Sequence, residues 1–482
     1  MAAKTQVTSY LVFLVFVATL GPLQFGYHLA ELNTPQAVLT CDQATVTVSS
    51  KGLPQCIPMN PTQFGLVSSS YTLGGFVGAL IAGPVATKSG RLPALRGTTV
   101  FFILGSAIEA VSSNIPLLVI GRFLSGIGAG ASIVVGPIFI SEVAPPASRG
   151  FFGAFTQVMT NVGILLASLL GYFLSRGSLW RVILAVGAAL GLTKLLGLLV
   201  VPETPTWLAE HERTAQARKV LQRIRGRDAD IEAEVKAWSA FANSEAAEER
   251  QSLLSPPPQN APARSPPVTI FNVITDPKNR AAVYAVVVVM ISQQFTGINS
   301  IIMYSVSLLQ DTFPTGAPLL AILISVLNLV VTAACSPLPD RIGRKTCLLL
   351  SITGMGLASM LLALGISVNQ KALSAVASLS FVASFAVGLG PVPFILASEL
   401  VGPEAVGATQ SWALAANWVS TFIVAQFFPM LNMWLGGHGR IYWIFAALAA
   451  LFGSLIAWFV PETKGKANAD AVWGRERNLH RD

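Results

Sequence analysis

Twelve long apolar stretches dominate this sequence and limit what it can fold into. A transmembrane helix needs about 20 mostly apolar residues, and each stretch reaches that length. They occupy residues 9–30, 62–86, 94–113, 115–140, 150–174, 179–200, 280–310, 316–338, 346–367, 372–400, 405–431 and 440–460. A helix satisfies its own backbone hydrogen bonds and can therefore cross a bilayer. We expect an all-α membrane protein with twelve transmembrane helices.

The composition excludes soluble folds. Hydrophobic residues make up 53% of the chain and charged residues only 11%, against about 25% charged residues in soluble proteins. The same values exclude disordered chains, coiled coils and small disulfide scaffolds. The net charge of +8 lies on loops, so it indicates membrane orientation rather than nucleic-acid binding.

The distribution of the 31 lysines and arginines predicts the orientation. Two of them, Arg122 and Lys194, lie inside spans. The loops that face one side hold only Lys51, Arg176, Arg181, Lys371 and Arg440. All the others lie at the termini or in the loops on the opposite side, so the positive-inside bias predicts that both termini are cytosolic.

The spans form two groups, at 1–200 and 280–463. The linker at 201–279 is expected to hold amphipathic helices at 206–226 and 228–250 and a proline-rich segment at 255–267, and a short cytosolic tail covers 464–482. Landmarks repeat between the groups: Gly90-Arg91 corresponds to Gly343-Arg344, Ser141-Glu142 to Ser398-Glu399, and Pro202-Glu203-Thr204 to Pro461-Glu462-Thr463. Two duplicated six-helix halves are typical of transporters with a midplane site and alternating access.

Six short motifs carry a family resemblance. They are Gly121-Arg122-Phe123, Pro202-Glu203-Thr204-Pro205, Gln293-Gln294-Phe295-Thr296-Gly297-Ile298-Asn299, Asp340-Arg341-Ile342-Gly343-Arg344-Lys345, Gly390-Pro391-Val392-Pro393 and Pro461-Glu462-Thr463-Lys464-Gly465. Their order and placement resemble the sugar porter family of the major facilitator superfamily over nearly the whole chain. The resemblance implies the fold of the major facilitator superfamily and a hexose-like substrate. We expect no cofactor.

Carboxamides in the spans are the candidate sugar site, because an amide offers both the donors and the acceptors that a sugar hydroxyl needs. Gly297 between Gln293 and Asn299 predicts a broken helix that lines a cavity. With the resemblance, the expected substrate-binding residues are Gln157, Gln293, Gln294, Asn299, Asn328, Phe394, Asn417 and Trp418. The alternative is that these amides form hydrogen bonds between helices, worth about 0.6 kcal/mol each.

Ionisable residues inside spans are functional candidates by default. His28 and Glu31 lie three residues apart, so they are neighbours on a helix. Many proton-coupled members of the family have an aspartate where this chain has His28, and that aspartate is thought to pair with the arginine matching Arg122. We therefore predict a proton-coupling cluster of His28, Glu31 and Arg122, with plain facilitation as the alternative. Glu109 and Lys194 are expected to snorkel or to pair locally.

Charged residues at the cytosolic ends of spans resemble the family's ion-pair latch. The expected members are Arg91, Glu142, Arg149, Glu203, Asp340, Arg341, Arg344, Glu399 and Glu462. The interruption of span 372–400 by Gly390, Pro391 and Pro393 predicts a gate, with Tyr304 as its partner.

Other signals are weaker. Cys41 and Cys56 share a non-cytosolic loop, where a disulfide and two free thiols are equally compatible with the sequence. No Cys/His spacing predicts a metal site. The glycines at 126–130 favour close helix packing over nucleotide binding. No catalytic constellation is present, so we do not expect an enzyme.

The linker contains a candidate sorting signal. Glu249, Leu253 and Leu254 resemble an acidic dileucine signal that a sorting adaptor reads, and the region around His28 is similar to fungal vacuolar members of the family. We expect a vacuolar or lysosomal membrane, with the plasma membrane as the alternative. The predicted function is transport of a neutral monosaccharide such as glucose, facilitative or proton-coupled. The alternatives are a non-transporting sugar sensor and a polyol or inositol transporter.

Overall fold

The computed structural model describes residues 7–42, 52–227, 229–236, 238, 271–310, 312–402, 405–466 and 469–475. Within these ranges the chain is helical and contains twelve segments long and apolar enough to cross a membrane. The first group is α1 (Ser9–Ala30), α3 (Pro61–Ser89), α4 (Arg91–Val111), α5 (Ile115–Val143), α6 (Arg149–Leu174) and α7 (Trp180–Leu199). The predicted fold class is therefore confirmed.

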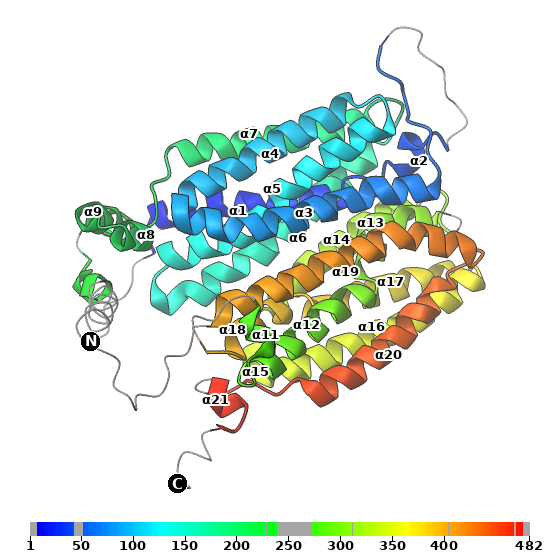
Figure 1. Cartoon of the computed structure of the whole chain (residues 1–482). Coiled ribbons are helices and arrows are strands. Elements are labelled where there is room, and N and C mark those ends of the chain that lie inside the picture. The colour runs from blue at the N-terminus through cyan, green and yellow to red at the C-terminus, as the bar shows by residue number, and fades with distance from the viewer. Residues whose placement is uncertain are drawn as a thin grey trace.

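The second group repeats this pattern with two interrupted spans. It comprises α12 (Arg280–Phe295) with α13 (Ile298–Leu309), α14 (Ala317–Cys335), α16 (Arg344–Ser367), α17 (Lys371–Val387) with α18 (Val392–Glu399), α19 (Val406–Trp434) and α20 (Ile441–Phe459). Figure 1 shows the two groups as two bundles lying side by side, blue to cyan and green to red. Helices α3 and α6 of the first bundle pack against α19 and α14 of the second.

Both interruptions were predicted from glycine and proline. Gly297 separates α12 from α13 and has φ +96°, a left-handed conformation that favours glycine. A Cβ atom there would also lie 2.6 Å from the Phe445 ring. The second interruption lies between Val387 and Val392, around Gly390 and Pro391. The second break frees the carbonyl oxygens of Leu389 and Gly390, which accept from Gln293 Nε2.

Small residues bring α3 and α5 close together. A Cβ atom on Gly130 would lie 1.8 Å from the Gly75 carbonyl oxygen, so no larger residue fits there. The glycines at 126–130 therefore serve close packing of two helices, as predicted.

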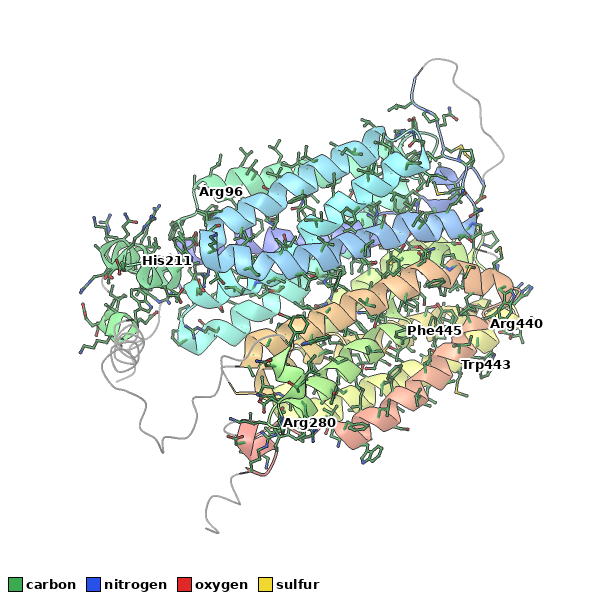
Figure 2. All side chains as sticks on the ribbon, viewed as in Figure 1. Arg96, His211, Arg280, Arg440, Trp443 and Phe445 are labelled. Carbon is green, nitrogen blue, oxygen red and sulfur yellow. A yellow bond between two sulfur atoms is a disulfide. The ribbon has the colours of Figure 1, made fainter. Side chains whose placement is uncertain are left out.

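The bundle has two distinct ends. At one end, which we call the terminal end, α1 begins, α20 ends, and the short helices α8 (Pro205–Glu210), α9 (Thr214–Arg225), α11 (Asn272–Thr275), α15 (Leu338–Ile342) and α21 (Ala469–Val472) lie. Arg96, His211 and Arg280 lie toward this end, whereas Arg440 lies at the opposite end (Figure 2). The helix predicted at 206–226 is wrong in one respect. It is two helices, because Glu212 between them has φ +60°.

The opposite end, which we call the disulfide end, carries α2 (Gln36–Leu39) and a disulfide between Cys41 and Cys56. The loop beyond this bond is held on α7: Trp180 Nε1 donates to the Gln55 carbonyl at 2.6 Å, and Arg181 Nη2 donates to the Pro54 carbonyl at 2.8 Å. The disulfide and these two hydrogen bonds fix the loop at the start of α7, at the disulfide end of the first bundle.

Candidate functional site

Four amides meet inside the second bundle. Gln293 Nε2 donates to the carbonyl oxygen of Leu389 in the interruption of the tenth span. Its Oε1 accepts from Asn417 Nδ2 of α19 at 2.5 Å and from Gln294 Nε2 at 3.0 Å. Asn299 Nδ2 of α13 donates to Gln294 Oε1 at 2.6 Å. We call Gln293, Gln294, Asn299 and Asn417 the amide cluster.

The cluster depends on the broken seventh span. Gln294 and Asn299 are five residues apart, a spacing that turns side chains away from each other on a continuous helix. The left-handed Gly297 reorients α13, and the two side chains come within hydrogen-bond distance. Asn417 is half-buried, whereas the others are 3–6% exposed. The site is uncharged and offers free donor and acceptor capacity on its amide groups.

The two bundles contact each other around the cluster. The Trp418 ring lies directly against Gly75 of α3, and its edge faces Phe25 of α1 at 5.9 Å between ring centres. Phe394 is half-buried on α18, next to the interruption. Gln157 of α6, in the first bundle, is half-buried. The first bundle thus contributes the Phe25 ring beside Trp418.

Asn328 has a different setting from the cluster. Its Nδ2 donates to Asn161 Oδ1 of α6 at 3.3 Å, and Asn161 Nδ2 donates to Thr332 Oγ1 at 2.9 Å. Sequence reasoning missed Asn161, because a single asparagine in an apolar span gives no sign of the face it occupies. These bonds join the two bundles through buried side chains, which is the interhelical role given above as the alternative for a lone amide.

Tyr304 is fully buried. Its hydroxyl donates to the Ala425 carbonyl of α19 at 2.6 Å, its ring stacks on Phe428, and it meets the Phe64 ring of α3 edge-on. The hydroxyl thus bonds to α19, while the carbonyl oxygens around Gly390 accept from Gln293. Pro391 and Pro393 bound the first turn of α18, where proline's missing N–H leaves no helical bond unmade.

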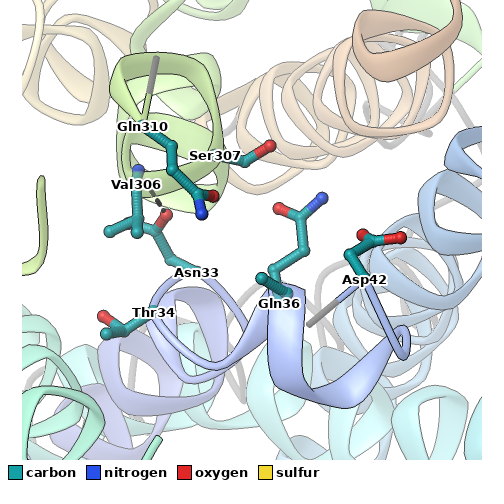
Figure 3. Close-up of a pocket in the computed structure, with 8 residues that line it drawn as sticks. Asn33, Thr34, Gln36, Asp42, Val306, Ser307 and Gln310 are labelled. Atoms are coloured by element: carbon teal, nitrogen blue, oxygen red, sulfur yellow. Dashed lines mark hydrogen bonds between the residues drawn. The ribbon is translucent and has the colours of Figure 1, made fainter. Parts of the chain in front are cut away.

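At the disulfide end, the two bundles are joined through Asn33, which follows α1. Its Nδ2 donates to Ser305 Oγ at 2.9 Å, and its Oδ1 accepts the Val306 N–H at 3.1 Å. A small polar cavity of about 90 Å³ adjoins this contact (Figure 3). Toward the terminal end a larger cavity of about 190 Å³ lies between α3, α5 and α19, lined mainly by apolar residues. The bundles are therefore bonded at the disulfide end, and a void lies between α3, α5 and α19 nearer the terminal end.

A second polar site lies inside the first bundle, between α1, α4 and α5. Arg122 Nη1 donates to Glu31 Oε1 at 2.5 Å and to the His28 carbonyl at 2.9 Å. His28 Nδ1 is 2.9 Å from the same Glu31 oxygen. Glu109 joins them: its Oε2 lies 3.9 Å from Arg122 Nη1, and its Oε1 accepts from Ser125 Oγ at 2.6 Å. The carboxylate that pairs with Arg122 is therefore that of Glu31, and His28 contacts Arg122 through its backbone carbonyl.

Every member of this charged cluster (His28, Glu31, Glu109 and Arg122) is 0% exposed. Glu109 therefore pairs inside the bundle and does not snorkel. Lys194 is equally buried, and its Nζ donates to Thr98 Oγ1 at 2.8 Å and Ser132 Oγ at 3.1 Å. It also pairs locally.

The charged residues at the terminal end form two matching sets, one per bundle. Arg91 Nη2 contacts Glu142 Oε1 at 2.7 Å, and Arg344 Nη2 contacts Glu399 Oε1 at 2.8 Å. The side chains of Glu203 and Glu462 accept the backbone N–H groups that begin α4 and α16. Thr204 and Thr463 donate to Glu142 and Glu399. The repeat seen in the sequence is thus a repeat of hydrogen bonds.

These ion pairs lie within bundles. Among the described residues, no ion pair joins the two bundles at the terminal end. Asp340 contacts Arg344 at 2.8 Å, whereas Arg149 and Arg341 are exposed. Partial burial of Glu462 opposes its charge, but N–H donors from Lys464, Arg344, Thr346 and Thr463 together hold its pKa below the ordinary value. Glu462 is therefore ionised at neutral pH and anchors α16.

The predicted dileucine signal, with Glu249, Leu253 and Leu254, lies outside the described residues, as do most of the helix predicted at 228–250 and the whole proline-rich segment.

Comparison with known proteins agrees with this architecture. The profile of the family described as Sugar (and other) transporter matches residues 14–471. The chain is 34% identical to the probable metabolite transport protein YBR241C of Saccharomyces cerevisiae, over 98% of this chain and 96% of the relative. It is 32% identical to vacuolar protein sorting-associated protein 73 of the same yeast, over 96% and 95%.

Solved structures give the same result. The partially occluded inward-open form of the Escherichia coli xylose transporter XylE superposes with a TM-score of 0.76 at 26% identity, covering 95% of this chain and 100% of that one. The protein is thus an integral membrane transporter and not an enzyme. Its twelve helices, its repeated terminal-end motifs and these matches show that the chain belongs to the sugar transporter family of the major facilitator superfamily.

Proposed function

We propose that this transporter carries a neutral monosaccharide, a hexose such as glucose, by alternating access between its two bundles. The observation that carries the proposal is the amide cluster, which is uncharged, lies at a broken helix and includes Asn417, next in sequence to Trp418, whose ring packs against the first bundle. A stacked aromatic ring and several amides suit the apolar face and the hydroxyls of a sugar. One relative, a facilitated glucose transporter of rat, is 28% identical over 98% of this chain.

Uptake of radiolabelled glucose by the purified protein in proteoliposomes tests this proposal. We expect saturable uptake that unlabelled hexoses compete away and that deoxy analogues compete less well, because an amide left without its partner costs about 1–3 kcal/mol. Competition by inositol but not by hexoses would favour the polyol alternative. Binding of sugar without any flux would favour a sensor.

The charged cluster supports proton coupling as the second part of the proposal. His28, Glu31 and Arg122 lie in contact inside the first bundle. A buried ion pair that changes protonation can favour one conformation over the other. Accumulation of glucose driven by an imposed pH gradient is the expected result, and equilibration without accumulation would instead show a facilitator.

The terminal-end ion pairs are proposed to act as a cytosolic latch. We expect Arg344→Ala and Glu399→Ala to shift the protein toward the inward-open conformation by loosening α16 from α18. The measurement is thiol labelling of Gln410→Cys, which lines the 190 Å³ cavity, in a background without Cys335 and Cys347. Labelling should speed up by as much as about tenfold, the effect of roughly 1.4 kcal/mol. Lys371→Ala, at the other end, is the control, and equal labelling rates in all variants would contradict the latch.

We propose a vacuolar or lysosomal membrane as the location, with both termini cytosolic. The support is the positive-inside bias, the Glu249-Leu253-Leu254 pattern, and a relative named as a vacuolar protein sorting-associated protein. A fluorescent fusion carrying Leu253→Ala and Leu254→Ala is expected to move to the cell surface. The same fusion with Leu221→Ala, a leucine on α9 outside the motif, controls for general damage, and an unchanged distribution of the double variant would exclude the signal.

A further inference from the structure

Glu109 has no assigned role in the proposed function, yet it is completely buried in the last turn of α4. Among the described residues, only one of its two carboxyl oxygens has a hydrogen-bond partner, Ser125. Its Oε2 has none and lies 3.9 Å from Arg122 Nη1, beyond hydrogen-bond distance. Glu31 shows the same asymmetry, because its Oε1 contacts both Arg122 and His28 whereas its Oε2 has no partner.

The charges of the cluster do not balance without a proton. Arg122 carries one permanent positive charge, and Glu31 and Glu109 would carry two negative charges if both were ionised. One ring nitrogen of His28 and one carboxylate oxygen each of Glu31 and Glu109 all lie within 4.8 Å of one another. An uncompensated ionised group in a dry interior is strongly unfavourable. The cluster becomes neutral when it binds one proton.

The neighbouring groups make their polar contacts elsewhere. From α7, Lys194 lies 5.6 Å from the centre of the Phe102 ring, and its Nζ donates to Thr98 Oγ1 and Ser132 Oγ. From α1, the Tyr27 hydroxyl donates to the Ile183 carbonyl. From α3, Tyr71 places its ring 4.5 Å from the Arg122 guanidinium. From α7, Arg181 directs Nη1 to the carbonyl oxygens of Ala110 and Ser112 and Nη2 to that of Pro54. From α4, Ser106 Oγ lies 3.4 Å from His28 Nε2. The proton is therefore held within the cluster itself.

The geometry also distinguishes between the two carboxyls. Glu31 receives the direct bond from Arg122 and lies beside the His28 ring, so its ionised form is stabilised. Glu109 receives only a hydroxyl bond from Ser125, and a proton on its Oε2 would neutralise the carboxyl and turn that oxygen into an O–H donor. We propose that Glu109 is the proton-binding residue of this transporter, paired with an ionised Glu31. As a coupling site it rests on the transport function proposed above, but its protonation can be measured without any sugar.

Infrared difference spectroscopy of the purified full-length protein in lipid nanodiscs tests the site. Above neutral pH, where exposed carboxyls are ionised, we expect a carbonyl stretch from a protonated carboxylic acid that disappears in Glu109→Gln. Ser125→Ala is expected to shift this band to higher frequency, because it removes the hydrogen bond to the Glu109 carbonyl oxygen. Glu210→Gln, on the exposed helix α8, should leave the band unchanged. Absence of the band in the wild type, or a band that is the same in Glu109→Gln, would overturn the assignment. If Glu109→Gln does not fold, an unshifted band in Ser125→Ala would overturn it.

Transport measurements then test the coupling role. Glu109→Gln is expected to exchange labelled for unlabelled glucose across the membrane at a rate near that of the wild type, and to lose accumulation driven by a pH gradient. Accumulation retained in Glu109→Gln, or absent from the wild type, would overturn that role. Failure of the wild type to exchange any sugar would instead overturn the proposed transport function, while the infrared band would still report the proton on Glu109.

Discussion

Replacing Gln293 by leucine is expected to reduce glucose uptake by about a hundredfold or more. Gln293 holds together the tenth-span interruption, Gln294 and Asn417. Its loss removes the oxygen that accepts from Asn417 Nδ2 and Gln294 Nε2, at about 1–3 kcal/mol for each N–H donor left unpaired. Since 1.4 kcal/mol is tenfold in an equilibrium constant, two unpaired donors account for an effect of this size. Initial rates in proteoliposomes, measured over a range of glucose concentrations, separate KM from kcat.

Gln24→Leu is the matched control for this experiment. Gln24 is also a fully buried glutamine in a spanning helix, but its Nε2 donates only to the Gly187 carbonyl within the first bundle, at 3.3 Å. Its Oε1 has no partner, so leucine removes an unsatisfied atom there. We expect uptake within about threefold of the wild type for this variant. Equal effects of the two substitutions would show that the amide cluster has no special role in sugar binding.

The largest expected effect on stability comes from Arg122→Met. This substitution keeps an unbranched apolar chain of about the length of arginine's aliphatic part, but it removes the guanidinium that contacts Glu31 and lies near Glu109. Breaking a buried ion pair by removing one partner typically costs about 3–5 kcal/mol. We therefore expect the Tm of the detergent-solubilised protein to fall by several degrees, read from intrinsic tryptophan fluorescence during heating.

A double variant distinguishes loss of charge balance from loss of packing. Arg122→Met combined with Glu31→Gln removes the ion and its main counterion together, so part of the lost Tm should return. Arg96→Met is the control, because Arg96 donates only to the Leu198 carbonyl near the terminal end. A double variant less stable than Arg122→Met alone would mean that the stability at this site comes from packing and not from charge.

Much of the fold was predictable because the bilayer acts on local properties of the chain. A span must be apolar over a fixed length, and Gly297 breaks the seventh span through its own backbone freedom. The neighbouring pair His28 and Glu31 follows from helical spacing alone. The prediction of one helix at 206–226 was wrong, because the chain turns at Glu212, a residue type that does not mark a helix break in the sequence.

The candidate sites were only partly predictable, for a physical reason. Sequence places Glu109 and Asn161 in particular spans, but the partner of each depends on how the helices rotate and tilt against one another, which packing of small residues sets. Tyr304 shows the consequence, since the sequence could not tell whether it faces α18 or α19.

The sequence by itself determined the twelve spans, the duplication, the broken seventh helix and the residue types available for recognising a sugar. Only the tertiary structure decided that four amides join in one bundle, that Asn328 bonds across to Asn161, and that two carboxyls share one arginine. Hydropathy and helical spacing are properties of neighbours in the chain. Contacts such as Glu31 with Arg122 join residues 91 positions apart, and they exist only after the helices have packed.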